Sequence, residues 1–208
     1  MKGGHRVRDQ DVLQHLRNDV HGENWDALMS DLFAYYKPRL LRMAVNMLND
    51  AELAEDAVSE IWIRVLTHLS TFRHDAKFST WLYRIAMNTI IDMERAKGRM
   101  MTYGQPNENL PSTQSEDPDS HCEQSFKQEL VRYALTRLSP MQRSLIIMRD
   151  IEHLPIKQLA TILAIPETAV KSRLHRARKA LKRLLQQRTR VPGQESVGTV
   201  SLSEWGGL

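Results

Sequence analysis

The segment from Ile165 to Leu185 constrains this chain most, because its basic and apolar residues fall on opposite sides of one helix. At 3.6 residues per turn, the apolar side consists of Val170, Leu174, Ala177, Leu181 and Leu184. The basic side consists of Lys171, His175, Arg176, Arg178, Lys179, Lys182 and Arg183. The pattern predicts a helix that packs one side on a small core and presents positive charge to a polyanion.

A short amphipathic segment at residues 155–163 precedes this helix, and the two are separated by only three residues, 164–166. Pro166 occupies a position that proline tolerates at the start of a helix. A short helix, a tight turn and a basic helix form a helix-turn-helix, whose second helix enters the major groove of DNA.

Two other interpretations of the basic helix are less consistent with its residues. A membrane-surface or calmodulin-target helix needs a bulky apolar face, often aromatic, whereas this one contains no Trp or Phe. A merely solvated face would alternate the signs of its charges, but Glu167 is the only acidic residue between positions 165 and 190. DNA recognition is therefore the favoured interpretation.

Length and composition limit the remaining possibilities. A chain of 208 residues suits one or two small domains. Its net charge is only +4. The one cysteine, Cys122, excludes an intrachain disulfide framework and favours a reducing compartment. Because no segment resembles a signal peptide or a membrane span, we expect a cytoplasmic protein without direct membrane insertion.

The distribution of hydrophobic periodicity predicts an all-α fold with two small helical domains joined by a flexible acidic linker, the second containing the helix-turn-helix. The linker carries five acidic residues and no Lys or Arg between positions 104 and 125, so it cannot bury enough apolar surface to fold alone. The expected parts are a flexible N-terminal segment at 1–24, a first domain at 25–100, the linker at 101–125, a second domain at 126–188 and a flexible tail at 189–208.

Within the first domain, apolar stripes predict a helix before Pro38, which can start or bend the next helical segment. Asn49 and Asp50 suit a turn and a helix cap. An acidic helix follows at 53–69, and a long helix runs from Ser79 or Thr80 to Arg99. In the second domain we expect helices at 128–138 and 140–150, ahead of the helix-turn-helix.

Two further surfaces are candidates for binding. The long helix places Arg84, Asn88, Asp92, Arg95 and Arg99 in one quadrant, beside a loop that contains Phe72, Arg73, His74, Lys77 and Phe78. Cations beside exposed aromatic rings suit single-stranded nucleic acid. A plain solvated face is the alternative for the helix, and at least one of the two phenylalanines is expected in the core.

The acidic helix carries an apolar residue on its outer side. Ile63 lies outward, among Asp56, Ser59 and Glu60, whereas the other large apolar residues cover the inner half. One exposed isoleucine needs no explanation, but an apolar centre with an acidic rim also suits a protein contact.

Enzymatic constellations are missing from the sequence. It contains no phosphate-binding glycine loop, no helical pair of zinc-binding histidines and no arguable Ser–His–Asp set. His121 and Cys122 offer at most two metal ligands. We therefore predict that the chain is not an enzyme and uses no metal and no cofactor.

The residues at this point resemble the extracytoplasmic-function (ECF) sigma factors of bacterial RNA polymerase. The first half carries AEDAVSEIW at 54–62 and STWLYRIAMN at 79–88, and the second half carries LSPMQR at 138–143 and AVKSRLHRAR at 169–178. These motifs cover both expected domains in the order that the family has.

The resemblance implies a factor that binds core RNA polymerase and directs transcription initiation, with the first domain as sigma region 2 and the second as sigma region 4. Residues implied at the melted downstream promoter element are Phe72, Arg73, His74, Lys77, Arg84 and Asn88. Residues implied at the duplex upstream element are Thr168, Lys171, Ser172, Arg173, His175, Arg176 and Lys179. Residues implied at core polymerase are Glu55, Asp56, Ser59, Glu60 and Ile63.

The resemblance also implies an inhibitory anti-sigma factor, often linked to the inner membrane. Two alternatives remain open from the sequence. One is a helix-turn-helix regulator that acts without joining polymerase, and the other is a pure interaction module that occupies a regulator.

Overall fold

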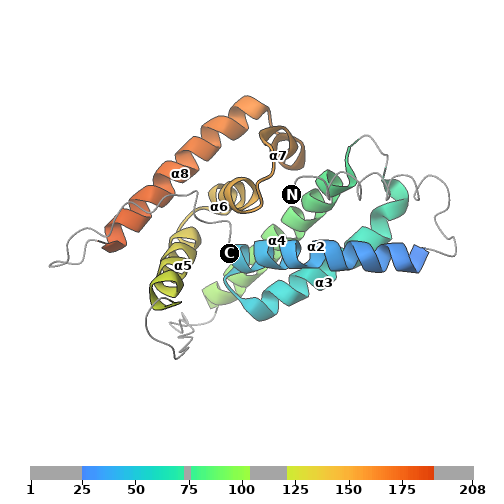
Figure 1. The fold of residues 1–208 in the computed structure, drawn as a ribbon, viewed down its shortest axis with the longest axis horizontal. Helices are drawn as coiled ribbons and strands as arrows, with labels where there is room; N and C mark the ends of the chain where they lie inside the picture. The colour runs from blue at the N-terminus through green and yellow to red at the C-terminus, as the bar shows by residue number, and fades with distance from the viewer. Residues whose placement is uncertain (1–24, 73–75, 104–120, 190–208) are drawn as a thin grey trace.

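The computed structural model describes residues 25–72, 76–103 and 121–189, and every regular element within them is helical (Figure 1). The elements in chain order are α2 Trp25–Leu48, α3 Ala51–His68, the 3₁₀ turn η1 Leu69–Thr71, α4 Phe78–Tyr103, α5 His121–Thr136, α6 Pro140–Ile146, the π-helical segment η2 Ile147–Ile151, α7 Ile156–Leu163 and α8 Glu167–Thr189. The all-α class is therefore confirmed.

Helices α2, α3 and α4 form the first block of the fold (Figure 1). Their apolar stripes meet in a core that includes Tyr36, Leu40, Phe78 and Leu82, all fully buried. The predicted inner half of α3 is buried as expected, with Ala54, Ala57, Val58, Ile61, Trp62 and Val65 on it and Leu69 just beyond its end. A period of 3.6 residues is sufficient to predict such a face.

Pro38 does not start a new segment, because α2 runs through it as one helix of 24 residues. Proline has no N–H to donate to the carbonyl four residues earlier. Both Ala34 and Pro38 are exposed, so water can satisfy that carbonyl. Leu40 and Met43 on the opposite face are completely buried and hold the helix in place on both sides of the proline.

The start of α3 is capped as the sequence predicts. Asn49 has a φ of 49°, a conformation that asparagine tolerates better than most residues. The carboxylate of Asp50 accepts a hydrogen bond from the N–H of Leu53 at 3.1 Å and one from Lys97 Nζ at 2.8 Å. Asp50 thus ends the turn after α2, begins α3 and binds α4.

Helices α5 to α8 form the second block, in which α8 packs against α5, α6 and α7. The first turn of α6 is closed by a capping box between Ser139 and Gln142, with Pro140 in the first turn, a combination that favours helix initiation. The predicted helix at 140–150 is present, but its last turn is the π-helical η2.

The ends of the predicted 101–125 linker are helical, which corrects its bounds. Helix α4 continues to Tyr103, and α5 begins at His121 instead of Gln128. Residues 121–127 are mostly polar and carry little apolar periodicity, but a helix anchored by buried Leu130 and Val131 can extend through them at small cost per residue. The remaining part, 104–120, lies outside the described residues, as do the predicted terminal segments at 1–24 and 190–208.

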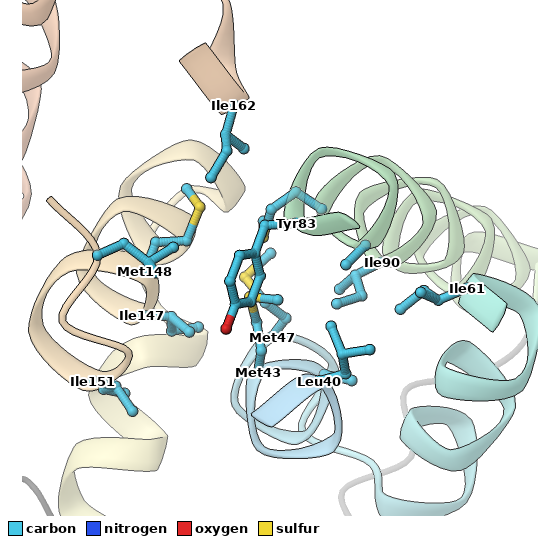
Figure 2. Packing of buried hydrophobic residues seen from close by; sticks show 14 of the residues in the cluster. Leu40, Met43, Met47, Ile61, Tyr83, Ile90, Ile147, Met148, Ile151 and Ile162 are labelled. Carbon is cyan, nitrogen blue, oxygen red and sulfur yellow. The ribbon is translucent and has the colours of Figure 1, made fainter. Parts of the chain in front are cut away.

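The two blocks share one continuous apolar core (Figure 2). Helix α2 touches α5, α6 and η2, and α4 touches α7. Figure 2 shows Tyr83 of α4 and Met47 of α2 facing Met148 of η2 and Ile162 of α7. Burial raises the pKa of the Tyr83 hydroxyl above its usual value. The fold therefore fixes the helix-turn-helix beside the first block.

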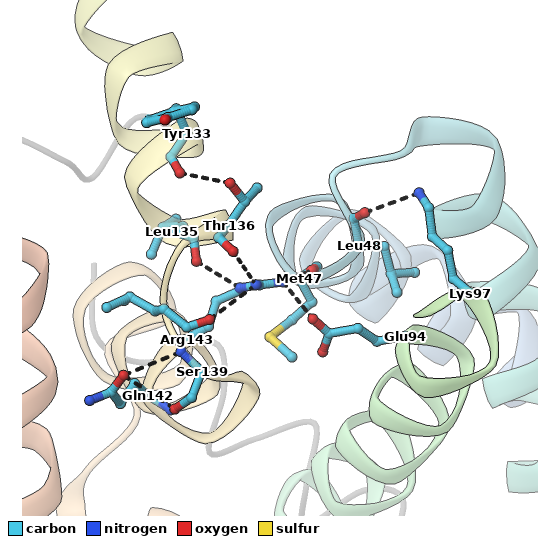
Figure 3. A network of polar contacts seen from close by, with 11 residues as sticks. Met47, Leu48, Glu94, Lys97, Tyr133, Leu135, Thr136, Ser139, Gln142 and Arg143 are labelled. Atoms are coloured by element: carbon cyan, nitrogen blue, oxygen red, sulfur yellow. Dashed lines mark hydrogen bonds and ion pairs between the residues drawn. The ribbon is translucent and has the colours of Figure 1, made fainter. Parts of the chain in front are cut away.

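A buried arginine joins the blocks by polar contacts as well (Figure 3). Arg143 of α6 is 6% exposed. Its guanidinium binds Glu94 of α4 at 2.7 Å and donates to the carbonyl of Met47 at the end of α2. It also donates to three carbonyls at the end of α5 and just beyond it, those of Leu135, Thr136 and Leu138.

The Asp50 cap gives the first testable prediction. Asp50→Ala should lower the free energy of unfolding by about 1 kcal/mol, because Leu53 N–H loses its acceptor. Asp50→Asn keeps an acceptor oxygen and should retain most of that contribution, losing only the charge facing Lys97.

The contribution of the Asp50 carboxylate to the free energy of unfolding also depends on pH. The hydrogen bond from Lys97 holds the pKa of Asp50 below its usual value, so the carboxylate stabilises the fold above the unfolded-state pKa of about 3.9. That contribution is lost as the pH falls through the lower folded-state pKa. Urea unfolding followed by circular dichroism at pH 7 and pH 3 measures both effects, and equal stability of wild type and Asp50→Ala at pH 7 would contradict the cap.

Candidate nucleic-acid interface

A helix-turn-helix is present where the sequence predicts it. Helix α7 ends at Leu163, and its C-cap residue Ala164 adopts the left-handed conformation with φ 53° and ψ 42°. The N–H of Ile165 then returns to the carbonyl of Ala160 at 3.1 Å, and α8 begins at Glu167. A glycine is the usual residue at such a helix end because it has no Cβ penalty, so alanine is strained here.

Helix α8 divides into the two predicted sides. Val170, Leu174, Ala177 and Leu181 are buried against the second block. Lys171, His175, Arg176, Lys179, Lys182 and Arg183 are exposed. The exposed face thus concentrates positive charge from Lys and Arg, as a surface that meets phosphates requires.

Arg178 is an exception to the predicted basic face. Its guanidinium binds the carboxylate of Asp150 through two contacts, one of them Nε to Oδ2 at 3.0 Å. The hydrogen bond that Arg178 donates to this carboxylate raises the pKa of the guanidinium. Because its charge is neutralised within the protein, Arg178 holds α8 on η2 instead of facing a ligand.

The residues predicted to contact the upstream element lie on α8 between positions 168 and 179. Thr168, Lys171, Ser172, His175, Arg176 and Lys179 are exposed, and Arg173 is half-buried. Arg176 Nε lies 3.4 Å from the carbonyl of Ser172 within the same helix. The structure therefore places these seven residues on one helix. Lys179 lies farther along it, and the other six lie near its start, where major-groove contacts concentrate.

Phe72 is not the exposed ring that the sequence analysis expects. It is 6% exposed and packs against Trp81 at 5.2 Å and Phe78 at 6.2 Å between ring centroids. Phe78 is completely buried. Both phenylalanines belong to the core, because their rings, just after η1 and at the start of α4, pack against each other and against Trp81. Phe72 thus has no face available for a base in this conformation.

The other residues of the predicted downstream site do not form one described surface. Arg73 and His74 lie outside the described residues. Lys77 is exposed, and its carbonyl accepts the N–H groups of Thr80 and Trp81. Arg84 and Asn88 are exposed on α4, but Arg84 Nη2 donates to the carbonyl of Thr161 on α7 at 2.6 Å.

Farther along α4 the predicted quadrant becomes an ion-paired surface. Asp92 lies 3.9 Å from Arg95 and 3.9 Å from Arg64 of α3. The side chain of Arg99 lies outside the described set. Among the described side chains of this face, the contacts with a carboxylate are therefore in the second half of α4.

The outer face of α3 forms an apolar patch with an acidic rim, and we call Ile63, Leu66 and Phe33 the α3 patch. Ile63 is 59% exposed, Leu66 55% and Phe33 of α2 38%. Phe33 packs edge-on against Trp62, with centroids 5.2 Å apart. Sequence reasoning identified Ile63 and missed the other two, although Leu66 follows Ile63 at a helical spacing of three.

The polar residues predicted around Ile63 lie on α3, in the turns that precede it. Glu55, Asp56 and Ser59 are exposed, and Glu60 is half-buried. Glu60 pairs with Arg64 at 2.7 Å, and Glu55 lies 3.7 Å from Lys37. An apolar centre with charged residues at its margin is the usual arrangement of a protein interface.

Two kinds of site have no counterpart in the described parts of the chain. No group of three or more His, Cys, Asp or Glu side chains gathers there in a way that could hold a metal ion. None of the described helices is both long enough and apolar enough to cross a membrane.

Comparisons with known proteins agree with this geometry. Residues 32–100 match the Sigma-70 region 2 family and residues 128–181 match Sigma-70, region 4. The RNA polymerase sigma factor YlaC of Bacillus subtilis is 30% identical over 156 residues, covering 74% of this chain and 90% of YlaC. The ECF RNA polymerase sigma factor SigW of the same organism is 30% identical over 164 residues, covering 75% of this chain and 88% of SigW.

Two solved structures share the fold. The sigma factor RpoE of Bartonella quintana, solved with the anti-sigma factor NepR, superposes with a TM-score of 0.61 at 22% identity, covering 76% of this chain and 96% of that chain. CnrH, solved with the cytosolic domain of CnrY, gives 0.62 at 20% identity, covering 88% and 97%.

Both family regions thus occur in one chain in the order of a Sigma-70 protein. The chain belongs to the ECF sigma factors of bacterial RNA polymerase, as its motifs indicate. Proteins of this class bind core RNA polymerase and promoter DNA and act in transcription initiation.

The strained turn of the helix-turn-helix yields a stability prediction. Ala164→Gly should raise the free energy of unfolding by about 0.5–1 kcal/mol, because relief of the left-handed strain exceeds the extra entropy that glycine has in the unfolded chain. Ala160→Gly, inside α7, should lower it by about 1 kcal/mol. Chemical denaturation of both variants measures the difference, and a loss of stability in Ala164→Gly would contradict the strain.

Proposed function

We propose that this sigma factor divides promoter recognition between its blocks, with α8 on the duplex upstream element, the start of α4 on the melted downstream element and the α3 patch on core polymerase. The observation that carries the proposal is the exposed basic face of α8, opposite a buried apolar face on the same helix. Reconstitution with core polymerase, followed by transcription from a promoter that the factor controls, tests the function as a whole.

The roles on α8 follow from its chemistry. Lys171, Arg173 and Arg176 lie near its start, where a recognition helix meets base edges, and arginine can form two hydrogen bonds to guanine. Lys179 lies farther along the helix, where a cation meets phosphates and adds affinity without sequence preference. Thr168, Ser172 and His175 complete the proposed upstream surface.

The downstream role is assigned to Lys77, Arg84 and Asn88, together with Arg73 and His74 of the preceding loop. Cations meet the phosphates of a separated strand, and the amide of Asn88 can bind a base edge. Phe72 contributes by supporting this loop from the core. The proposed site acts after duplex binding, since it needs unpaired bases.

Core polymerase is the proposed partner of the α3 patch. Ile63, Leu66 and Phe33 supply the desolvated centre, and Glu55, Asp56, Ser59 and Glu60 supply the rim. The proposed contact surface therefore includes two apolar residues beyond those predicted from the sequence, Leu66 and Phe33, because both are exposed.

An anti-sigma factor is the proposed regulator, because the structural neighbour RpoE was solved with the anti-sigma factor NepR. We place the factor in the bacterial cytoplasm, where its DNA and polymerase partners are, and an anti-sigma protein can hold it at the inner membrane. The chain itself is proposed to carry no catalytic chemistry. A helix-turn-helix regulator that bypasses polymerase is the alternative, and failure to copurify with core enzyme would favour it.

Arg176 tests the duplex reader. Arg176→Ala should weaken binding to the cognate upstream element by about 1–3 kcal/mol, while binding to scrambled duplex changes less. Lys182→Ala is the matched control and should weaken both duplexes to a similar, smaller extent. Fluorescence anisotropy at fixed salt measures the four affinities, and an unchanged ratio of specific to scrambled binding in Arg176→Ala would reject the base-reading role.

Ile63 tests the polymerase patch. Ile63→Arg should weaken core binding by about 2 kcal/mol or more, because it puts a charge at a desolvated contact centre. Ala34→Arg introduces the same charge on the outer side of α2 and should leave affinity unchanged. Competition against another sigma factor for core enzyme gives both values, and equal affinities of the two variants would remove the patch from the interface.

A further inference from the structure

A forked ion pair between Arg178 of α8 and Asp150 of η2 joins the basic helix to the rest of the second block. Nε of Arg178 donates to Oδ2 of Asp150 at 3.0 Å, and Nη2 donates to Oδ1. Such a contact between a guanidinium and a carboxylate fixes direction as well as distance. The Asp150 side chain is only 13% exposed, whereas that of Arg178 is 42% exposed. The carboxylate thus belongs to the protein interior, and the guanidinium lies at the surface.

The carboxylate of Asp150 stands on a backbone segment that the core holds in place. Its neighbours Ile147, Met148 and Ile151 in η2 are buried. The N–H of Glu152 returns to the carbonyl of Ile147 at 2.9 Å, five residues earlier, so this turn contains one residue more than an α-helical turn. The acceptor of the ion pair is therefore fixed, and α8 is oriented against it.

Arg178 lies at the edge between the two sides of α8. It follows the buried Leu174 by four residues and precedes the exposed Lys182 by four, so these three side chains share one row along the helix. The helices α5, α6 and α7 all lie on one side of α8 (Figure 1). Apolar contacts on that side are not directional. A fork at the edge of the buried stripe therefore opposes rotation of α8 about its own axis.

We propose that Arg178 is a positioning residue for promoter recognition: with Asp150 it fixes the rotation of α8, so that Lys171 and Arg176 meet base edges. It makes no phosphate contact of its own. The inference rests on the proposed role of α8 as the duplex reader. A helix that is free to turn still attracts phosphates through its charges, but it loses the hydrogen bonds to bases, which need a defined geometry.

Two single variants of the full-length chain test the pair on a cognate and a scrambled duplex by fluorescence anisotropy. Asp150→Asn removes the charge opposite Arg178, and Arg178→Lys keeps the cation but loses the fork. Each should lower the ratio of cognate to scrambled affinity about tenfold, because a misplaced bidentate contact no longer discriminates between bases. Scrambled binding should not weaken in Asp150→Asn, since the charge of Arg178 is set free. Arg137→Lys makes the same exchange on the exposed surface of α5 and should change neither affinity.

A double variant separates positioning from direct contact with DNA. Asp150→Asn together with Arg178→Gln removes the pair without changing the net charge, and its affinity ratio should fall no further than in the single variants, because one pair is lost only once. The salt dependence of its binding to the scrambled duplex should equal that of the wild type. Lys182→Ala should reduce that slope by about one, as expected for a residue that meets a phosphate.

A spectroscopic measurement reports the setting of α8 without DNA. Spin labels at Arg132→Cys on α5 and Lys182→Cys on α8, both at exposed positions, give a distance distribution in a Cys122→Ser background. The distribution should broaden in Asp150→Asn and Arg178→Lys and stay narrow in Arg137→Lys. Partial unfolding lowers the cognate and scrambled affinities by the same factor, so it cannot imitate the expected fall in their ratio.

The outcomes distinguish the ion pair from the function on which it rests. If the wild type prefers the cognate duplex and both single variants keep that preference, the positioning role is overturned. If Asp150→Asn binds both duplexes more tightly and the double variant loses about one from the salt slope, Arg178 contacts phosphate itself and the proposal is wrong. If the wild type shows no preference, the duplex-reading function and the specificity role fail together, while a distribution that still broadens supports the pair as the element that orients α8.

Discussion

The position of the helix-turn-helix depends on the buried guanidinium of Arg143. An arginine side chain has five N–H donors, and each of them has an acceptor here, four in backbone carbonyls and one in Glu94. A cation this deeply buried is tolerated only when its donors are satisfied and its charge is balanced. Its partners come from the ends of α2 and α5 and from α4, so the side chain fixes where three helices meet.

The chemistry of helix ends explains why an arginine suits this junction. The last carbonyls of a helix have no partner within it and carry partial negative charge. The Met47 carbonyl near the end of α2 and those of Leu135 and Thr136 at the end of α5 converge on Arg143. One guanidinium therefore satisfies two helix ends at once.

Periodicity made part of this structure predictable. The faces of α3 and α8, the Asp50 cap and the helix-turn-helix all depend on residues within a few turns of one another, so their spacing identifies them. Three features could not be predicted in this way. Phe72 is buried by Phe78 and Trp81 across a loop, Arg178 is neutralised by Asp150 at a distance of 28 residues, and Arg84 meets a carbonyl 77 residues away. Such contacts depend on tertiary packing, which local patterns do not encode.

The same residue type therefore has opposite uses in this chain, and only burial and partners distinguish them. Arg176 is exposed and bonds only within its own helix, whereas Arg42 and Arg143 are balanced by carboxylates across the boundary. The cations in these contacts between the blocks, Arg42, Arg84 and Arg143, are arginines. A planar guanidinium can bind a carboxylate through two hydrogen bonds or several carbonyls together, whereas a lysine ammonium cannot do so in one plane. Lysines instead occupy exposed positions on α8, where a hydrated point charge can follow phosphates without a fixed partner. Arginines therefore make the specific contacts between the two blocks, whereas exposed lysines on α8 supply nonspecific attraction for phosphates.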